Sequence, residues 1–132
     1  MELYIGGYAQ GKLSYVLQKK GLSQEDVICG GDFVWKEEQL LEKKIFDDFE
    51  LWVRREIEKG EKVEEKVEEK VEQLLKINPT IIVISDEVGN GVVPVEPLER
   101  EYRERLGRIL CTLAQRADRM ERILCGMGQR IK

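Results

Sequence analysis

The chain has 132 residues, a length that suits one domain with its own hydrophobic core. Its 26 acidic and 22 basic residues leave a net charge of -4, so charge alone draws it neither to nucleic-acid phosphates nor to an anionic membrane. No apolar run approaches the ~20 residues of a membrane helix. The N-terminus also lacks the basic and apolar regions of a signal peptide. We therefore expect a globular, cytoplasmic protein with no membrane span and no nucleic-acid partner.

Histidine is absent from the whole chain. Its absence excludes a Ser-His-Asp triad, a Cys-His pair, a His-ligated metal and any phosphohistidine intermediate. General acid and base chemistry would fall to Asp, Glu, Lys or Tyr. Three cysteines, Cys29, Cys111 and Cys125, are odd in number and lack CxxC spacing, which argues against a disulfide framework or a zinc ribbon. We expect them to be buried thiols in a reducing cytosol.

The first third of the chain alternates strand and helix signals. Residues 2–5 are apolar β-formers that end at two glycines, as a buried strand would. Residues 12–20 carry apolar side chains on one helical face, and Gly21 is a plausible C-cap. Residues 27–29 predict a second short strand, which Gly30 and Gly31 would end.

The middle of the chain is mostly charged and helical in pattern. Residues 35–45 have leucines and isoleucine at helical spacing, and a second helix is predicted from about Asp48 to Ile57. A short strand over residues 45–47 is the competing interpretation. Residues 61–72 are three copies of Glu-Lys-Val-Glu, which predict a solvated amphipathic helix on the outer face of the sheet. A coiled coil is disfavoured, because a four-residue repeat drifts ~40° per copy around a helix.

The last third predicts a central strand, a long helix and a final strand. Asn78-Pro79 would end the preceding helix, and residues 80–84 are β-prone and apolar on both faces. An irregular loop over residues 88–94, an amphipathic helix over 99–117 and a strand over 119–125 follow. The alternation predicts an α/β fold in one domain, 1–132, with a mainly parallel sheet and helices on both faces.

A glycine-rich turn after the first strand carries the strongest chemical signal. It reads Gly-Gly-Tyr-Ala-Gln-Gly-Lys-Leu, which matches G-x-x-x-x-G-K between a strand and a helix. Glycines let backbone N–H groups gather around a phosphate, and the helix N-terminus and the lysine add positive charge. The Ser or Thr that would bind Mg²⁺ is replaced by leucine, and the serine after it is turned by ~100° on a helix. A plain strand-turn-helix is the alternative. The residues expected to hold a triphosphate are Gly6, Gly7, Tyr8, Ala9, Gln10, Gly11, Lys12 and Leu13.

Two adjacent acids follow the predicted central strand. Asp86 and Glu87 come after four apolar β-formers, as in the arrangement where a carboxylate at the end of a strand holds Mg²⁺ or its water. On an extended backbone adjacent side chains point to opposite faces, so we expect only one of them to face the glycine-rich turn. Acidic residues at a strand end are also common without any function. The candidate catalytic residues are Lys12, Asp86 and Glu87, and the two acids are the candidate metal ligands.

Four stretches together resemble the adenosylcobinamide kinase / adenosylcobinamide-phosphate guanylyltransferase family of vitamin B12 assembly. They are residues 6–12, residues 85–94, Tyr102-Arg103 with Gly107-Arg108, and residues 125–132. The stretch Glu-Val-Gly-Asn-Gly-Val-Val-Pro is the most specific of them. The similarity is close over residues 80–132, clear over 1–32 and faint between, where this chain is shorter than typical members.

The resemblance implies a P-loop NTPase-like three-layer sandwich that is usually assembled as a trimer. It also implies two reactions: phosphorylation of the adenosylcobinamide hydroxyl by GTP or ATP with Mg²⁺, and transfer of GMP to that phosphate through a guanylylated histidine. The partners would be nucleotide and corrinoid small molecules. By carry-over, the glycine-rich turn would hold the triphosphate, Cys29, Gly30 and Gly31 would also touch GTP, and Asp86 or Glu87 would serve the metal or the hydroxyl.

The chain departs from the family pattern at residues that matter for chemistry. The guanylylated histidine has no counterpart, which excludes guanylyl transfer by that route. Leu13, Ala9 and Gln10 replace the family's Ser or Thr and its Arg-Ser pair. Two hypotheses follow: a kinase that retains half of the family's activity, and a non-catalytic paralogue that binds a nucleotide or a corrinoid.

Overall fold

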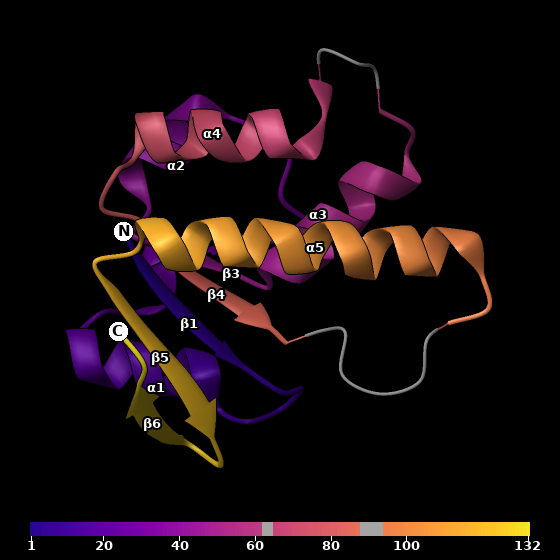
Figure 1. Cartoon of the computed structure of the whole chain (residues 1–132). Coiled ribbons are helices and arrows are strands. Elements are labelled where there is room, and N and C mark those ends of the chain that lie inside the picture. The colour runs from indigo at the N-terminus through magenta and orange to yellow at the C-terminus, as the bar shows by residue number, and fades with distance from the viewer. Residues whose placement is uncertain (62–64, 88–93) are drawn as a thin grey trace.

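The sheet has six strands, and five of them are parallel (Figure 1). A computed structural model describes residues 1–61, 65–87 and 94–132. The strands lie in the order β2-β3-β4-β1-β5-β6, and only β6 runs antiparallel to its neighbour. Their bounds are β1 Glu2–Gly6, β2 Val27–Cys29, β3 Ile45–Asp47, β4 Ile82–Asp86, β5 Arg119–Leu124 and β6 Met127–Arg130. The prediction of a mainly parallel α/β sheet is confirmed.

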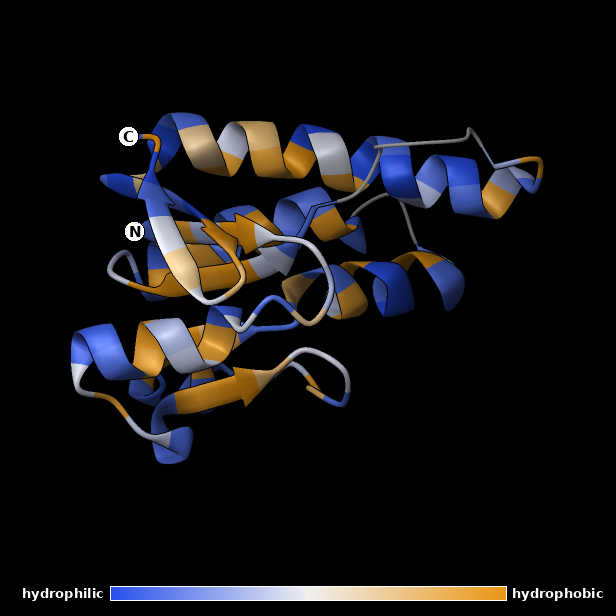
Figure 2. Ribbon diagram, turned by 90° about the horizontal axis from the view of Figure 1, so that it is seen from below, coloured by the Kyte–Doolittle hydropathy of each residue, from blue (hydrophilic) through white to orange (hydrophobic). Residues whose placement is uncertain are grey.

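The helices cover both faces of the sheet, but unequally. They are α1 Lys12–Lys20, α2 Glu37–Glu42, α3 Phe49–Glu58, α4 Val67–Ile77 and α5 Pro97–Arg116, with a short 3-10 helix η1 at Gln24–Asp26. On one face, Tyr4, Ile84 and Ile123 pack with Val16 of α1. The other face buries the larger cluster, with apolar side chains of α2, α3, α4 and α5. Figure 1 shows these layers, with α4 and α5 on one side of the sheet and α1 on the other, and Figure 2 shows strands coloured as hydrophobic in the interior.

The short strand β3 settles the two interpretations of the middle region. Ile45 and Phe46 are completely buried and pair with Ile82 and Val83 of β4, so these residues form a strand, and the helix begins only at Phe49. The preceding helix α2 is shorter than predicted. Trp35 lies outside it because its ring stacks on Trp52 of α3, with centroids 6.1 Å apart.

The repeat segment begins its helix later than the sequence pattern predicts. Lys66 has an extended backbone and is the N-cap of α4, so the helix starts at Val67, and residues 62–64 lie outside the described residues. The Val67 N–H donates to Glu61 Oε2 at 2.6 Å, and Arg105 of α5 binds both Glu61 and Glu68. The start of α4 is therefore held by tertiary ion pairs. The predicted apolar stripe is buried over its described part, at Val67, Val71, Leu74 and Leu75.

The C-terminus forms a hairpin that the sequence analysis missed. Strand β5 ends at Leu124, and Cys125 and Gly126 then turn the chain with φ of 50° and 74°. Two central residues with positive φ form the type I′ turn that joins antiparallel strands. Gly128 of β6 lies so close to α1 that a Cβ there would stand 2.1 Å from the Tyr15 hydroxyl. The hairpin is thereby packed onto the start of α1.

Two further expectations concern the membrane and the cysteines. Within the described residues, no helix is both long and apolar enough to cross a membrane. The expectation of buried cysteines is wrong, because Cys29, Cys111 and Cys125 are all exposed and unpaired. Cys29 ends β2, Cys111 lies on an exposed position of α5, and Cys125 lies in the hairpin turn.

Gly30 joins the ends of β2 and β3 by a close backbone approach. A Cβ on Gly30 would lie 2.1 Å from the Asp48 carbonyl oxygen, and the Gly30 N–H donates to Asp47 O at 2.9 Å. Only a residue without a side chain permits that approach. Gly107 in α5 is different, since nothing lies within 4 Å of a Cβ there.

We predict opposite effects for two glycine substitutions. Gly30→Ala should lower the free energy of unfolding by roughly 1–3 kcal/mol, because the new methyl group overlaps rigid backbone. Gly107→Ala should raise it by about 0.5–1 kcal/mol, because alanine is the better helix former. Urea unfolding followed by circular dichroism measures both. A neutral Gly30→Ala variant would contradict the close approach.

Candidate functional site

The register of the parallel strands brings the two chemical segments together. Gly6, the last residue of β1, is the Cα partner of Asp86, the last residue of β4. The chain leaves β1 toward α1 on one face and leaves β4 toward α5 on the other. In open α/β sheets, the crevice between two such neighbouring strands is where ligands bind. A Cβ on Gly6 would also lie 2.5 Å from Ile123 O of β5, so packing demands a glycine there.

Lys12 links the glycine-rich turn to the end of β4. Its Nζ donates to Gly7 O at 2.7 Å and to Asp86 Oδ1 at 2.6 Å. The lysine side chain is only 10% exposed, so the ammonium group is directed across the turn rather than into solvent. A positive charge held at this place is what a site for phosphate requires.

The N-terminus of α1 is open to an anion. Its N-cap is Gly11, with φ of 81°, so no side chain caps the helix, and its first turn contains no acidic residue. None of the backbone N–H groups from Gly7 to Gly11 donates to another described residue. Unpaired N–H groups at the positive end of a helix form an anion-binding arrangement.

The C-terminal hairpin holds the turn in place. Gln10 Oε1 accepts a hydrogen bond of 2.8 Å from the Cys125 N–H, and Gln10 O accepts one of 2.8 Å from Gly126. Both hydrogen bonds come from the β5-β6 turn. The glycine-rich turn is therefore fixed from one side by the hairpin and from the other by Lys12.

A cavity of about 360 Å³ opens beside this turn. Its walls come from the turn and the start of α1, from the junction between β3 and α3, and from the end of β4. The lining residues are Tyr8, Ala9, Gln10, Gly11, Lys12, Leu13, Ser14, Asp47, Asp48, Glu50, Leu51 and Asp86. Among them Lys12 is the one basic side chain, against four carboxyl groups.

Burial shifts the acidity of two carboxyl groups in this cavity. Burial, and after it the neighbouring charge of Asp86, raise the pKa of Glu50 to about 7. Burial and the charge of Asp48 raise the pKa of Asp47 to about 6. Clustered acids with raised pKa values are typical of functional sites, although structural acid clusters share the feature.

The structure places the predicted residues at different distances from the cavity. Asp86 lines it, whereas Glu87 turns away and binds Arg122 through Oε1 at 2.8 Å. The two side chains therefore point in opposite directions, as expected of adjacent residues on an extended backbone. Both Leu13 and Ser14 line the cavity.

The end of β2 lies behind the cavity rather than in it. Cys29 Sγ contacts Asp48 Oδ2 at 3.7 Å, and a Cβ on Gly31 would lie 3.6 Å from Leu51. Gly30 supports the Asp48 backbone, as described above. These residues reach the cavity through Asp48 and Leu51, which line it.

Sequence reasoning missed the acids at the junction of β3 and α3. Asp47, Asp48 and Glu50 line the cavity, yet the pattern places Asp48 and Glu50 in a predicted helix and Asp47 in the competing strand, with no chemical role for any of them. The signal that could have found them is the position of Asp47 at the carboxyl end of a parallel strand, next in the sheet to β4. The signal can be used only when residues 45–47 are assigned as a strand, which the sequence left as the competing interpretation.

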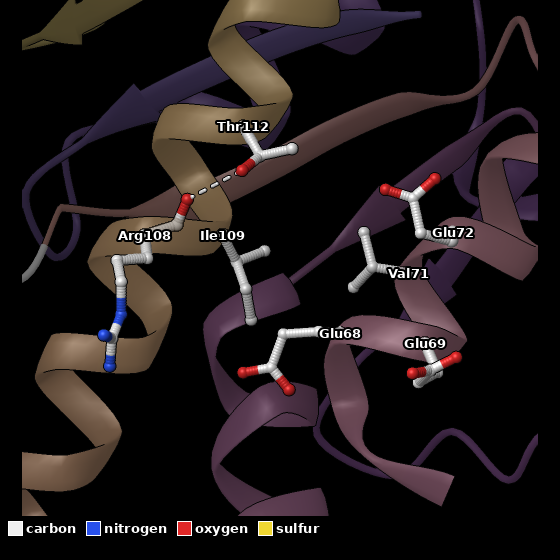
Figure 3. A pocket seen from close by; sticks show the side chains of 7 residues that line it. All are labelled: Glu68, Glu69, Val71, Glu72, Arg108, Ile109 and Thr112. Carbon is white, nitrogen blue, oxygen red and sulfur yellow. Dashed lines mark hydrogen bonds between the residues drawn. The ribbon is translucent and has the colours of Figure 1, made fainter. Parts of the chain in front are cut away.

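A second hollow, of about 300 Å³, lies between α4 and α5 (Figure 3). Val71 and Ile109, each 4% exposed, face one another across it, and Glu68, Glu72 and Arg108 surround them. Glu68 and Glu72 are ion-paired to arginines of α5. This is the charged seam between two helices of the outer layer, as the solvated repeat predicts, and it lies away from the carboxyl ends of the strands.

Comparison with known proteins identifies relatives for most of the chain. The model of the CobU family, described as cobinamide kinase / cobinamide phosphate guanyltransferase, matches residues 33–131. The bifunctional adenosylcobalamin biosynthesis protein CobU of Salmonella typhimurium is 36% identical over 52 residues. That alignment covers 39% of this chain and 29% of the relative, so the chain matches less than a third of the relative's length. The matched family range begins after the glycine-rich turn, whose interpretation therefore rests on its geometry.

We predict that Glu50 makes stability depend on pH. Its pKa is about 7 when folded and near 4.5 when unfolded, so the folded state holds the proton more tightly, and stability falls as pH rises between these values. Glu50→Gln should therefore gain roughly 2–3 kcal/mol over wild type at about pH 8, and much less at about pH 5. Urea unfolding in EDTA at both pH values measures the difference.

Glu58→Gln is the matched control, because Glu58 lies on the same helix but is half exposed and paired with Arg54. It should show no comparable gain at either pH. An equal effect of Glu50→Gln at both pH values would contradict the raised pKa of the buried Glu50 carboxyl group.

Proposed function

The chain belongs to the cobinamide kinase / cobinamide phosphate guanyltransferase family, and on that premise we propose that it binds GTP or ATP at the glycine-rich turn. The fold is the α/β arrangement of that family, and the turn follows its first strand. The proposed reaction is phosphoryl transfer to the hydroxyl group of adenosylcobinamide in cobalamin biosynthesis. The observation that carries the proposal is the inward-facing Lys12, beside backbone N–H groups that donate to no other described residue.

Each part of the turn has a role in holding a triphosphate. The free N–H groups of residues 7–11 and the uncapped N-terminus of α1 would contact phosphate oxygens. Lys12 would exchange its bond to Gly7 O for a phosphate oxygen, and its charge would stabilise the transferred phosphoryl group. Cys29, Gly30 and Gly31 would support this site from behind, through Asp48 and Leu51.

The cavity also fits a magnesium ion that would accompany the nucleotide. One ammonium group faces four carboxyl groups, so an unaccompanied triphosphate would meet net negative charge. Oxygen ligands from carboxylates are those that Mg²⁺ prefers, with phosphate oxygens completing its shell. Asp86 faces this space, whereas Glu87 is engaged with Arg122. When bound, the ion would neutralise charge on the phosphate oxygens.

The acceptor hydroxyl would be activated by a carboxylate of the same cavity. Without histidine, a proton leaving that hydroxyl group must pass to Asp or Glu, and Asp86 is the candidate closest to the turn. Guanylyl transfer through a histidine is chemically excluded, because the chain contains none. The proposed activity is accordingly the kinase half alone.

A second candidate function is nucleotide or corrinoid binding without turnover. Leu13 occupies the position where a hydroxyl group would bind Mg²⁺, and its apolar side chain packs toward the cluster beneath α1. A degenerate paralogue of this kind would keep the anion site and lose the chemistry. We further propose one domain over 1–132, a cytoplasmic location and a homo-oligomer, a trimer by family resemblance.

We predict that Lys12→Ala weakens nucleotide binding at least about tenfold, because the anion site loses its charged donor. Isothermal titration with GTP, ATP and GDP in Mg²⁺ measures it. Lys12→Arg, which keeps the charge, should retain part of the affinity. Lys20→Ala is the control, since Lys20 ends the same helix and binds Glu2 at 2.8 Å.

Activity decides between the two candidates. Nucleotide-dependent phosphorylation of adenosylcobinamide, lost in Lys12→Ala, supports the kinase. Nucleotide binding without phosphorylation at high enzyme and Mg²⁺ supports the binding paralogue. If the wild-type chain binds none of the three nucleotides, the kinase and the nucleotide-binding alternative are both overturned.

A further inference from the structure

We propose that Glu50 and Asp86 form a binding site for a divalent cation, Mg²⁺ or Mn²⁺, that the chain can load without a nucleotide. The inference deepens the proposed function and rests on it for the cation's purpose, since the ion would meet the phosphates beside the glycine-rich turn. In this site the second acidic ligand beside Asp86 is Glu50, and not Glu87, which follows Asp86 in the sequence.

The central observation is a buried carboxylate oxygen without a partner. Glu50 is only 5% exposed, lines the cavity, and its Oε2 has no hydrogen-bond partner among the described residues. A buried charged oxygen left unpaired costs free energy, and proteins pair such atoms or give them a metal ion. Arg54 and Arg55 lie on the same helix as Glu50, but they bind Glu58, Glu99 and backbone carbonyl groups instead of the Glu50 carboxylate.

Glu50 and Asp86 are direct electrostatic neighbours. The Asp86 charge is, after burial, the largest influence that raises the pKa of Glu50, and both side chains line the same cavity. Two acids brought this close repel each other unless a cation lies between them or one holds a proton. Lys12 offsets only one of them, because its 2.6 Å bond goes to Asp86.

Glu87 is unsuited to the same task in this structure. Both of its carboxylate oxygens are bound by Arg122, at 2.8 and 3.1 Å, and its side chain does not line the cavity. A cation at Glu87 would first have to displace an arginine. Glu50 needs no such exchange at its Oε2.

The number of ligands favours a hydrated ion. Among the described residues, no group of three or more acidic, cysteine or histidine side chains converges well enough to hold a metal by itself. Two carboxylates would leave several positions for water and, later, for phosphate oxygens. Mg²⁺ and its analogue Mn²⁺ are commonly held in this way, whereas Ca²⁺ and Zn²⁺ demand more protein ligands.

The test is a titration of the full chain with MnCl₂ alone, with free Mn²⁺ followed by electron paramagnetic resonance. Wild type should bind one equivalent at submillimolar to millimolar concentration. Glu50→Gln and Asp86→Asn should each weaken binding at least about tenfold. Glu87→Gln and the exposed Glu58→Gln should bind as wild type does. Circular dichroism and urea unfolding establish that each variant is folded.

The outcomes separate this inference from the nucleotide proposal. Lys12→Ala should bind Mn²⁺ at least as well as wild type, because it loses a competing positive charge, while its nucleotide binding falls. Unchanged Mn²⁺ affinity in Glu50→Gln, a loss confined to Glu87→Gln, or no Mn²⁺ binding to wild type would each overturn the cation site. Mn²⁺ binding that depends on Glu50, without nucleotide binding, would uphold the cation site and overturn the nucleotide proposal.

Discussion

The contact on which the rest of the site depends is the Lys12 ammonium group between Gly7 O and Asp86 Oδ1. It joins the residue that follows the glycine-rich turn to the end of a strand 74 residues later. The adjacent register of β1 and β4 makes the contact possible, because it sets Gly6 beside Asp86. The lysine is held in the cavity by an acid, and the proposed phosphate would have to replace one of its two partners.

Close backbone approaches keep the surrounding frame rigid. Gly6 lies against β5, Gly30 lies against the Asp48 carbonyl, and Gly128 lies against Tyr15. Gln10 adds two hydrogen bonds to the C-terminal hairpin. The carboxyl ends of the central strands are therefore held in fixed positions relative to one another. Several acidic side chains lie close together there, and their pKa values are raised. Mutual repulsion of this kind is relieved by a proton or by a bound cation.

The family match and the candidate site lie partly in different stretches of the chain. Membership follows from a match over residues 33–131, whereas the glycine-rich turn lies before that range. The chain has no histidine to carry a guanylyl group, yet it keeps a lysine, an open helix N-terminus and an acid at the end of β4. The proposed phosphoryl transfer, and the alternative of nucleotide binding without turnover, both rest on these three features.

The sequence pattern by itself was enough to predict the parallel α/β fold, the bounds of α1, the glycine-rich turn and the acid at the end of β4. The periodicity of strands and helices and the glycines of turns are local signals, which can be recognised within a few residues. Tertiary structure alone decided that residues 45–47 pair as a strand, that α4 starts at Val67, and that the C-terminus folds back as a hairpin. Each of these depends on partners far along the chain: β4 for β3, Arg105 for α4 and α1 for β6. For the same reason only the folded chain shows that Glu50 lines the cavity while Glu87 pairs with Arg122.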